Sequence, residues 1–486
     1  MSCKKAANCR GPGYATPQEA IKGPREKVLF ITAPSTQSDK APDALVTIDV
    51  DPESKSFGKA LCKLLMPNLG DEVHHMGWNV CSSCHGSSKL QRSHLILPCL
   101  NSSRIYIIDA TDPSNLSITK IIEKETLRKF DVTFPHTAHC LADGNIMVST
   151  LGDANDNNKC DFLLIDNKTF EPIGTWTKQN LTSETNLFGY DFWYQPYHNV
   201  MLSTEWGTPK KIFQGFNPED VGQGYYGNKI NVFNWKEKTM QQSITLEGEE
   251  GWLPLEVRFK HDPENKNAFI GTALGSALYH IYKVDNDGFE MKTRLAATVL
   301  PKKVKNWALP VMPGLITDIL ISMDDNFIFF SNWLHGDIRM YDIRDPFDVK
   351  LVGQVFIGGS IHKETDVIVT EDLELKEQPD ATYIKGLKID GGPQMLQLSL
   401  DGSRLYVTTS LYRKWDEQFY PGLIENGAKL LLVEIDNDLN IKTENRLKLN
   451  KNFLFDFGKL FDNGIPYLAH EMRYPGGDCT SDIFLK

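Results

Sequence analysis

Short runs of β-branched and aromatic residues, separated by polar turns, dominate the pattern of apolar and polar positions along the chain. Polar pairs at residues 143–144, 324–325 and 401–402 lead into the runs NIMVST, NFIFFSNW and SRLYVTTS. Turn residues that tolerate positive φ, flanked by strand-forming residues, are typical of β-hairpins. The long amphipathic stretches that alternate with strands in an α/β protein are not found. The pattern therefore predicts an all-β protein.

A similar apolar run that ends in a polar residue recurs along the whole chain. Seven such runs are ALVTID, RIYIID, FLLID, INVFN, LYHIYK, IRMYD and LLLVEID, ending at Asp49, Asp109, Asp166, Asn234, Lys283, Asp342 and Asp436. The steps between these ends are 60, 57, 68, 49, 59 and 94 residues. Seven similar β units in one chain are typical of a propeller, so the spacing predicts a seven-bladed β-propeller.

The spacing also predicts how the chain is divided. We expect residues 1–486 to form a single propeller domain, preceded by a short N-terminal extension over about residues 1–25. The long last step contains residues 358–393, which are charged and weakly periodic, and we interpret them as an excursion between blades. Strand-like runs within residues 437–486 are expected to pair with the first unit and close the ring, which removes free sheet edges.

Composition narrows the function classes. The chain has 52 Lys and Arg against 63 Asp and Glu, a net charge of −11, which disfavours nucleic acid as a partner. The N-terminus lacks the apolar run of a secretory signal, and the most apolar stretch, residues 309–323, is too short and interrupted to span a bilayer. Nine cysteines, an odd number, predict mostly reduced thiols in a cytosolic protein.

Six of the twelve histidines stand near predicted strand starts or turns in four separate units. They are His74, His75, His136, His139, His335 and His470. The first strand of each propeller unit lines the central channel, so distant residues can meet there. Imidazoles with nearby sulfur suit copper or zinc better than magnesium. Any single histidine could equally bond a backbone carbonyl between blades, but the group favours a metal site.

Two cysteines of the string CSSCH, Cys81 and Cys84, leave several roles open. The string matches the pattern of c-type haem attachment, but the chain has no export signal. A four-cysteine zinc site needs a second C-x-x-C, and a thioredoxin-like role needs a βαβ context. The alternatives that remain are a redox-sensitive thiol pair, part of a soft-metal site, or two structural cysteines.

Other motifs carry less information. The chain has no G-x-S-x-G elbow, P-loop or G-x-G-x-x-G sequence after a strand. Four carboxylates near strand starts could hold a hard cation, as in propeller hydrolases, or could cap strand ends: Asp191, Glu205, Glu256 and Asp318. The aromatic stretch at residues 189–209 could pack between blades, although Trp193 or Trp206 could line an apolar substrate pocket.

Five long strings are specific enough to indicate a family. They are HHMGWNVCSSC (74–84), GYDFWYQPYHNVMLSTEW (189–206), MPGLITDILISMDDNFIFFSNWLHGDIRMYD (312–342), GGPQMLQLSLDGSRLYVTTSLY (391–412) and AHEMRYPGGDCTSDI (469–483). These strings closely resemble the selenium-binding protein family, and the resemblance runs from residue 11 to the C-terminus. It implies a β-propeller and, because the animal members are methanethiol oxidases, conversion of methanethiol, dioxygen and water into formaldehyde, hydrogen sulfide and hydrogen peroxide.

The resemblance also implies a set of site residues. Copper is the implied metal, held among His74, His75, His136, His139, His335 and His470. His136, His139 and His335 are further implied to be catalytic, and Cys81 and Cys84 match the family's paired cysteines, implied to bind a cofactor. The family attaches selenium to a cysteine soon after the DVDP strand, but here Gly58 stands near that position and Cys62 follows later.

Two other functions remain open from the sequence. A non-catalytic propeller could bind selenium or sulfur compounds, acting in redox sensing or in protein transport through protein partners. A metal-dependent hydrolase would use Asp191, Glu256 and Asp318 around calcium or zinc. A metal analysis separates the copper enzyme from the hydrolase, and turnover of methanethiol separates the enzyme from the binding protein.

Overall fold

The computed structural model describes residues 12–179, 187–284 and 288–485, and antiparallel sheets dominate them. Six sheets of the described residues have four strands each. The first sheet contains β34 (Met472–Arg473), β1 (Val28–Ala33), β2 (Ala44–Asp49) and β3 (Ala60–Leu65), the second β4 (Gly77–Trp78), β5 (His94–Pro98), β6 (Ile105–Asp109) and β7 (Ser117–Ile122), and the third β8 (Thr133–Cys140), β9 (Ile146–Gly152), β10 (Asn158–Ile165) and β11 (Pro172–Thr175). The fourth contains β12 (Phe192–Gln195), β13 (Val200–Ser203), β14 (Lys229–Asn234) and β15 (Thr239–Thr245), the fifth β16 (Pro254–Phe259), β17 (Asn267–Thr272), β18 (Ala277–Lys283) and β19 (Met291–Thr298), and the sixth β22 (Ile316–Ile321), β23 (Phe327–Asn332), β24 (Asp337–Asp342) and β25 (Lys350–Phe356).

The other described elements are a five-stranded sheet, two small sheets and short α-helices. A five-stranded sheet contains β29 (Leu396–Leu398), β30 (Arg404–Val407), β31 (Lys429–Ile435), β32 (Leu447–Leu449) and β33 (Phe455–Asp456). Two small sheets contain β21 (Val311–Met312), β20 (Lys302–Lys305) and β26 (Ile368–Glu371), and β27 (Tyr383–Ile384) and β28 (Leu387–Lys388). The helices are α1 (Pro17–Ala20), α2 (Lys124–Arg128), α3 (Pro209–Ile212), α4 (Pro218–Gly222), α5 (Arg413–Phe419) and α6 (Pro421–Asn426).

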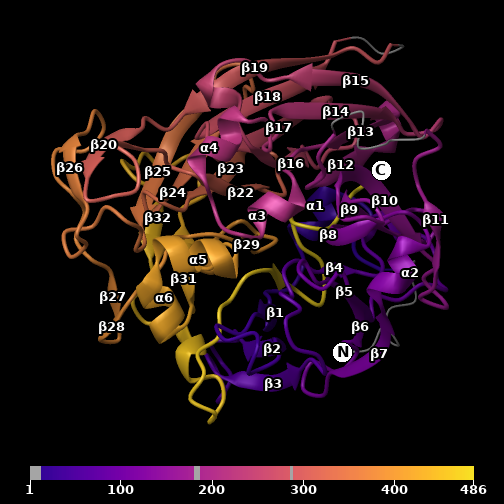
Figure 1. Cartoon of the computed structure of the whole chain (residues 1–486), viewed down its shortest axis with the longest axis horizontal. Helices are drawn as coiled ribbons and strands as arrows, with labels where there is room; N and C mark the ends of the chain where they lie inside the picture. The colour runs from indigo at the N-terminus through magenta and orange to yellow at the C-terminus, as the bar shows by residue number, and fades with distance from the viewer. Residues whose placement is uncertain (1–11, 180–186, 285–287, 486) are drawn as a thin grey trace.

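The large sheets are arranged around the middle of the molecule in chain order (Figure 1). In the sheets β8–β11 and β16–β19, the first strand lies near the middle of the molecule and the last strand, β11 or β19, lies at the periphery. This arrangement confirms the predicted all-β class and is propeller-like.

The recurring apolar runs of the sequence correspond to one structural position. They form β2, β6, β10, β14, β18, β24 and β31, and each is the third strand outward in its sheet. The predicted hairpins are also confirmed, because the turns at residues 143–144, 324–325 and 401–402 join β8 to β9, β22 to β23 and β29 to β30. All six residues of β2 are buried, whereas those of the outer strand β3 are at least partly exposed. Burial on both faces explains why the third strands have continuous apolar runs.

The C-terminal segment pairs with two different sheets. β34 pairs with β1, with Phe30 opposite Arg473 and Ile31 opposite Met472. The strand-like runs before it, β32 and β33, pair instead with β31. Of the described strands after β31, β34 alone joins the first sheet, and a bridge between Ser35 and Tyr467 extends this contact, because β32 and β33 complete the sheet in which the chain already lies.

Residues 358–393 lie between β25 and β29 and contribute only short strands. β26 pairs with β20, so this segment and the loop that follows β19 form one small sheet at the side of the molecule (Figure 1). Buried Lys302 forms ion pairs with Asp372 and Glu374, and Glu374 also binds Arg339 of β24. Charged side chains thus attach the small sheet to its large neighbour.

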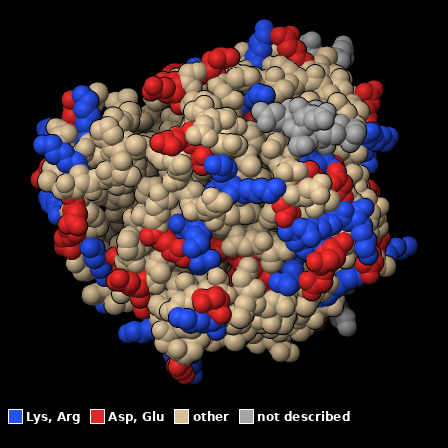
Figure 2. All heavy atoms as spheres, in the orientation of Figure 1, with Lys and Arg blue, Asp and Glu red and all other residues tan. Residues whose placement is uncertain are grey.

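The exposed charges show no extended basic area on the face drawn in Figure 2, where blue and red side chains of the described residues are intermixed. This agrees with the net charge of −11. Within the part of the chain that the structure describes, no helix is long and apolar enough to cross a membrane.

Gly77 allows β4 and β8 of neighbouring sheets to approach closely. A Cβ atom at Gly77 would lie 2.2 Å from the carbonyl oxygen of Ala138. We predict that Gly77→Ala lowers the free energy of unfolding by about 2 kcal/mol, because the backbone of β8 must move. Gly222→Ala is the matched control: no atom lies within 4 Å of its added Cβ. Urea unfolding measures both, and equal stability of the two variants would contradict the prediction.

Candidate metal centre

Four histidines from three separate parts of the chain form one buried cluster. The ring centroids of His74 and His470 lie 3.7 Å apart in a stacked pair, and those of His75 and His136 lie 4.2 Å apart. One nitrogen from each of His74, His75 and His136 lies within 4.8 Å of the others, so this group could hold a metal ion. His470 contacts both His74 and His75. The predicted convergence of distant imidazoles is therefore found for these four residues.

Three local features of the backbone bring these imidazoles together: an irregular segment, a β-bulge and the pairing of β34 with β1. Residues 74–76 lie outside a regular strand, so the neighbouring rings of His74 and His75 are not forced onto opposite faces. His136 is on β8, at a register irregularity between Pro135 and Ala138. Such a bulge redirects side chains near functional sites. His470 comes just before β34, so the pairing of β34 with β1 positions it.

Hydrogen bonds hold two of the imidazoles in one tautomer. His75 donates its Nδ1–H to the Glu471 carboxylate at 2.7 Å, and His470 donates its Nδ1–H to the Ser410 carbonyl at 2.9 Å. The Nε2 atoms of both rings then carry the free lone pair. Among the described residues, Nε2 of His75, His136 and His470 and Nδ1 of His74 are buried without hydrogen-bond partners. Four unpartnered buried nitrogens in one cluster fit a nitrogen-ligated metal.

Thr32 of β1 connects the two backbones that carry these ligands. Its hydroxyl donates to the His74 carbonyl at 2.9 Å and accepts a hydrogen bond from the Glu471 amide at 2.9 Å. Glu471 also pairs with Arg473. Outer contacts of this kind orient metal ligands and tune their affinity.

Burial keeps the cluster uncharged at neutral pH. It lowers the pKa of His75 and of His470 to about 3, with nearby Arg473 adding to the effect at His75 and His75 itself at His470. Burial also lowers the pKa of His74 and His136 well below the usual value, and the neighbouring histidines add to this effect. Neutral imidazole is the form that binds metals.

Aromatic side chains enclose the cluster. The Tyr190 ring lies 4.1 Å from the His136 ring, and Trp206 and Tyr412 lie 6.3 Å and 6.2 Å from His136 and His74. Surface clefts of about 590 and 610 Å³ have no cluster histidine in their walls. The cluster therefore suits a small ligand that can enter a closed interior.

The other two predicted histidines lie outside the cluster. His139 on β8 contacts Phe192 and Trp193, and burial lowers its pKa to about 4. His335 is in the turn between β23 and β24, where its Nε2 contacts the Met312 carbonyl at 3.2 Å. Neither forms a ring contact with the cluster among the described residues, so a ligand role for His139 and His335 stays a prediction. The position of His335 in a turn is a feature that a histidine count cannot show.

Three of the four carboxylates proposed for a hard cation surround an arginine instead, whereas Glu205 accepts hydrogen bonds from the Lys229 amide and the Asn231 side chain. Arg258 binds Asp191 at 2.6 Å and Glu256 at 2.8 Å, and it lies 3.9 Å from Asp318. Burial raises the pKa of Asp318 to about 8 and that of Glu256 well above its usual value. The guanidinium stands where the hydrolase hypothesis needs a calcium or zinc ion, which removes the support for that function.

The two cysteines of the C-x-x-C differ in their bonding. Cys81 forms a disulfide with Cys140, whereas Cys84 is a buried free thiol. The two cysteines of the C-x-x-C are therefore not paired with each other, and neither belongs to the metal-ligating group found among the described residues. Cys140 stands next to His139 in the sequence, but nothing in the spacing of 59 residues identifies it as the partner of Cys81.

The sequence did not indicate the residues that support the cluster. Glu471 and Ser410 orient two of the imidazoles, and Thr32 joins the backbones. A glutamate directly after His470 was the one available signal, since metal-binding histidines often donate to carboxylates.

Neutral, unpartnered imidazoles inside a propeller-like β-structure define a protein with a candidate histidine metal centre. The model of the 56 kDa selenium-binding protein family (SBP56) matches residues 8–485, and the chain belongs to this family. The chain is 52% identical over 485 residues to a methanethiol oxidase of Xenopus tropicalis, covering 99% of this chain and 100% of that protein. It is 51% identical over 484 residues to a methanethiol oxidase of Homo sapiens, covering 99% of each. A solved structure of a hypothetical selenium-binding protein from Sulfolobus tokodaii shows a TM-score of 0.83 and 31% identity, covering 97% of this chain and 98% of that one.

The buried neutral histidines should make the metal-free protein sensitive to acid. Their folded-state pKa values lie at 3 to 4 for His75, His139 and His470, below the value of about 6.5 in an unfolded chain. Below pH 6.5 the unfolded state binds more protons, so stability falls as the pH falls toward 4. We expect each such histidine to contribute a slope of about 1.4 kcal/mol per pH unit.

Urea unfolding of the metal-free protein between pH 7 and 4 measures this slope. His139→Gln should flatten it by one histidine's contribution, whereas Thr150→Ser, a buried substitution that keeps a hydroxyl, should leave the slope unchanged. An unaltered slope in His139→Gln would show that this ring does not titrate as predicted.

Removal of Arg258 should be costly because it leaves buried carboxylates without their cation. We predict that Arg258→Leu lowers the free energy of unfolding by about 3–5 kcal/mol. Arg344→Leu breaks the exposed pair with Asp342 and should cost less than about 1 kcal/mol. Chemical denaturation at pH 7 compares the two, and a small loss for Arg258→Leu would argue against a charge role for this arginine.

Proposed function

We propose that the protein is a methanethiol oxidase, which converts methanethiol, dioxygen and water into formaldehyde, hydrogen sulfide and hydrogen peroxide. The observation that carries the proposal is the identity of 51–52% over 99% of the chain to relatives that bear this name. The buried four-histidine cluster supports it, because oxidation by dioxygen in a protein is usually the work of a metal or an organic cofactor.

We further propose that the large sheets are seven blades of one closed propeller. The seven third strands and the pairing of β34 with β1 support this reading. The histidine cluster then lies in the central channel, between the innermost segments of the blades.

Copper is the metal we propose for the cluster, held by His74, His75, His136 and His470. Imidazole is a good ligand for copper, and the four nitrogens without partners supply lone pairs. Copper bound there would supply a redox-active Lewis acid that favours the thiolate form of a small thiol.

The surrounding residues suit a small, weakly polar substrate. Tyr190 and Trp206 provide an apolar wall beside His136, and the cluster is closed to bulk water. His139, three residues from His136 on β8, has two unpartnered buried nitrogens and is uncharged. We assign it the role of accepting the thiol proton, which needs a neutral base near the substrate.

The proposed compartment is the cytosol. Five of the described cysteines are free thiols, as expected where thiols stay mostly reduced. Small thiols and dioxygen are the proposed reaction partners, and docking of protein partners stays a prediction.

Binding of selenium without turnover is the second candidate function, favoured by the description of the family model. Gly58, at the position where the family carries its selenium cysteine, has a positive φ of 72° and no side chain. Cys62 on β3 is a partly buried free thiol in this region. We therefore give selenium attachment at the usual site less weight than the oxidase.

Copper loading and product analysis test the oxidase. We predict that His136→Ala lowers bound copper at least about tenfold and lowers production of hydrogen sulfide and peroxide in parallel, because a ligand is lost. His198→Gln, whose ring contacts the Glu264 carbonyl, is the control and should keep both. His335→Gln should keep its copper as well.

Two results would contradict this assignment. Full copper content in His136→Ala would place the metal elsewhere. A copper-loaded wild-type protein that yields no hydrogen sulfide from methanethiol would favour the binding function.

A further inference from the structure

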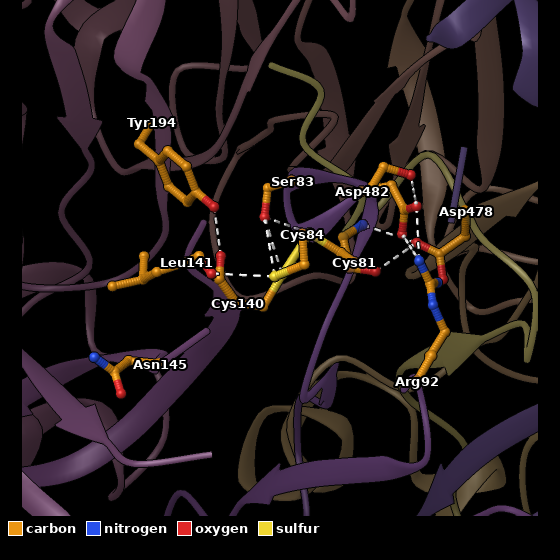
Figure 3. Close-up of a disulfide and its surroundings, with 12 residues drawn as sticks. Cys81, Ser83, Cys84, Arg92, Cys140, Leu141, Asn145, Tyr194, Asp478 and Asp482 are labelled. Atoms are coloured by element: carbon orange, nitrogen blue, oxygen red, sulfur yellow. Dashed lines mark hydrogen bonds and ion pairs between the residues drawn. A yellow bond between two sulfur atoms is a disulfide. The ribbon is translucent and has the colours of Figure 1, made fainter. Parts of the chain in front are cut away.

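A disulfide joins the two segments that carry three of the four cluster histidines (Figure 3). Cys81 follows β4, six residues after His75, and Cys140 is the last residue of β8, four residues after His136. β4 and β8 belong to neighbouring sheets. The cross-link therefore fixes the segment of His74 and His75 relative to the strand of His136.

A third sulfur lies beside this disulfide. The hydroxyl of Ser83 is 3.2 Å from Cys81 Sγ, 3.3 Å from Cys140 Sγ and 4.0 Å from Cys84 Sγ. Cys84 donates its S–H to the Leu141 carbonyl at 3.2 Å (Figure 3). One hydroxyl thus contacts both disulfide sulfurs and the free thiol, and it can pass a proton among them.

The turn between Cys81 and Cys84 is compatible with a disulfide of its own. Residues Ser82–Cys84 form a 3₁₀ turn, and the Cys84 amide donates to the Cys81 carbonyl at 3.0 Å. An i→i+3 turn brings its end Cα atoms within about 7 Å, close to the range that a disulfide spans. Cys84 can therefore replace Cys140 as the partner of Cys81.

Contacts that do not involve sulfur hold this turn in place. Ser82 donates to Asp482 at 2.5 Å and accepts from the Tyr14 amide at 3.1 Å. Arg92 binds both oxygens of Asp482 at 2.8 Å. A change of disulfide partner would thus leave the turn anchored to the C-terminal segment while it releases the end of β8.

We propose that Cys81, Cys84 and Cys140 form a thiol–disulfide exchange site that determines how tightly the histidine cluster holds its metal. In the exchange, the Cys84 sulfur attacks Cys81, a Cys81–Cys84 bond forms, and the Cys81–Cys140 bond breaks. The proton of Cys84 moves to Cys140, so one disulfide and one thiol are present before and after, and no oxidant or reductant is consumed.

The two disulfides have different structural effects. The Cys81–Cys140 bond links neighbouring sheets, whereas a Cys81–Cys84 bond closes only a local turn. In the second form β4 and β8 keep the contact of Gly77 with Ala138 but lose their covalent link. His136 is then less firmly placed against His75. The metal part of this inference rests on the proposed metal centre, but the exchange part does not.

Mapping of disulfides tests the exchange directly. Trypsin releases Cys81 and Cys84 in one peptide, residues 64–89, and Cys140 in another, residues 130–159. Metal-free protein is equilibrated at pH 8 with a glutathione buffer, alkylated and digested without reductant. We expect two forms in the mass spectrum: the two peptides linked with Cys84 alkylated, and peptide 64–89 internally bridged with Cys140 alkylated.

Variants make this result specific. Cys84→Ser should give only the linked peptides, and Cys62→Ser, a partly exposed thiol on β3, should behave as the wild type. If the wild type never shows the internal bridge, or if Cys84→Ser loses the linked form as fast as the wild type does, the exchange is refuted.

Cobalt(II) affinity, followed by its visible absorption, tests the effect on the cluster without measuring turnover. We expect Cys140→Ser, which lacks the inter-sheet bond, to bind cobalt at least about tenfold more weakly than the wild type or Cys84→Ser. Wild-type protein reduced with a phosphine serves as a second test if Cys140→Ser does not fold. Equal affinities would overturn the link to the cluster. Lack of cobalt binding by the oxidised wild type would refute the metal centre itself, while the exchange is still judged by the peptide map.

Discussion

The pairing of β34 with β1 is the interaction on which the candidate site depends. It joins residues more than 430 positions apart, and Thr32 bonds both to the His74 backbone and to that of Glu471. Without this pairing, nothing would hold His470 and the Glu471 carboxylate, which orients His75, near the other imidazoles. Two short strands thus determine the composition of a cluster whose members come from both ends of the chain.

The fold could be read from the sequence to a useful extent. The third strand of every large sheet was visible as an apolar run, because burial on both faces demands one. Inner strands such as β4 and β34 are only two residues long, which is too short for an alternating pattern, so periodicity does not reveal them. The pairing of the strands within residues 437–486 depends on which sheet has a free edge strand next to them, and no local sequence pattern shows which sheet that is.

The site was predicted in part, for related reasons. Four histidines converge because each precedes or occupies an inner strand, a position that unit spacing locates approximately. His335 occupies a turn after β23, a position that unit spacing does not distinguish from an inner strand. The partner of Cys81 depends on the contact between two sheets, whereas the C-x-x-C spacing reports only local proximity, so the sequence left the roles of Cys81 and Cys84 open.

The uncharged state of the cluster has a consequence for metal uptake. A ligand set that is protonated in the free protein must expel protons when it binds a cation, so its affinity falls steeply in mildly acidic solution. Here burial lowers the pKa of His75 and His470 to about 3 and that of His74 and His136 well below the usual value, so these rings are already neutral near pH 7. Competition between hydrogen ions and a metal for these nitrogens is therefore weak across the physiological range, and loading should depend on the concentration of free metal rather than on acidity.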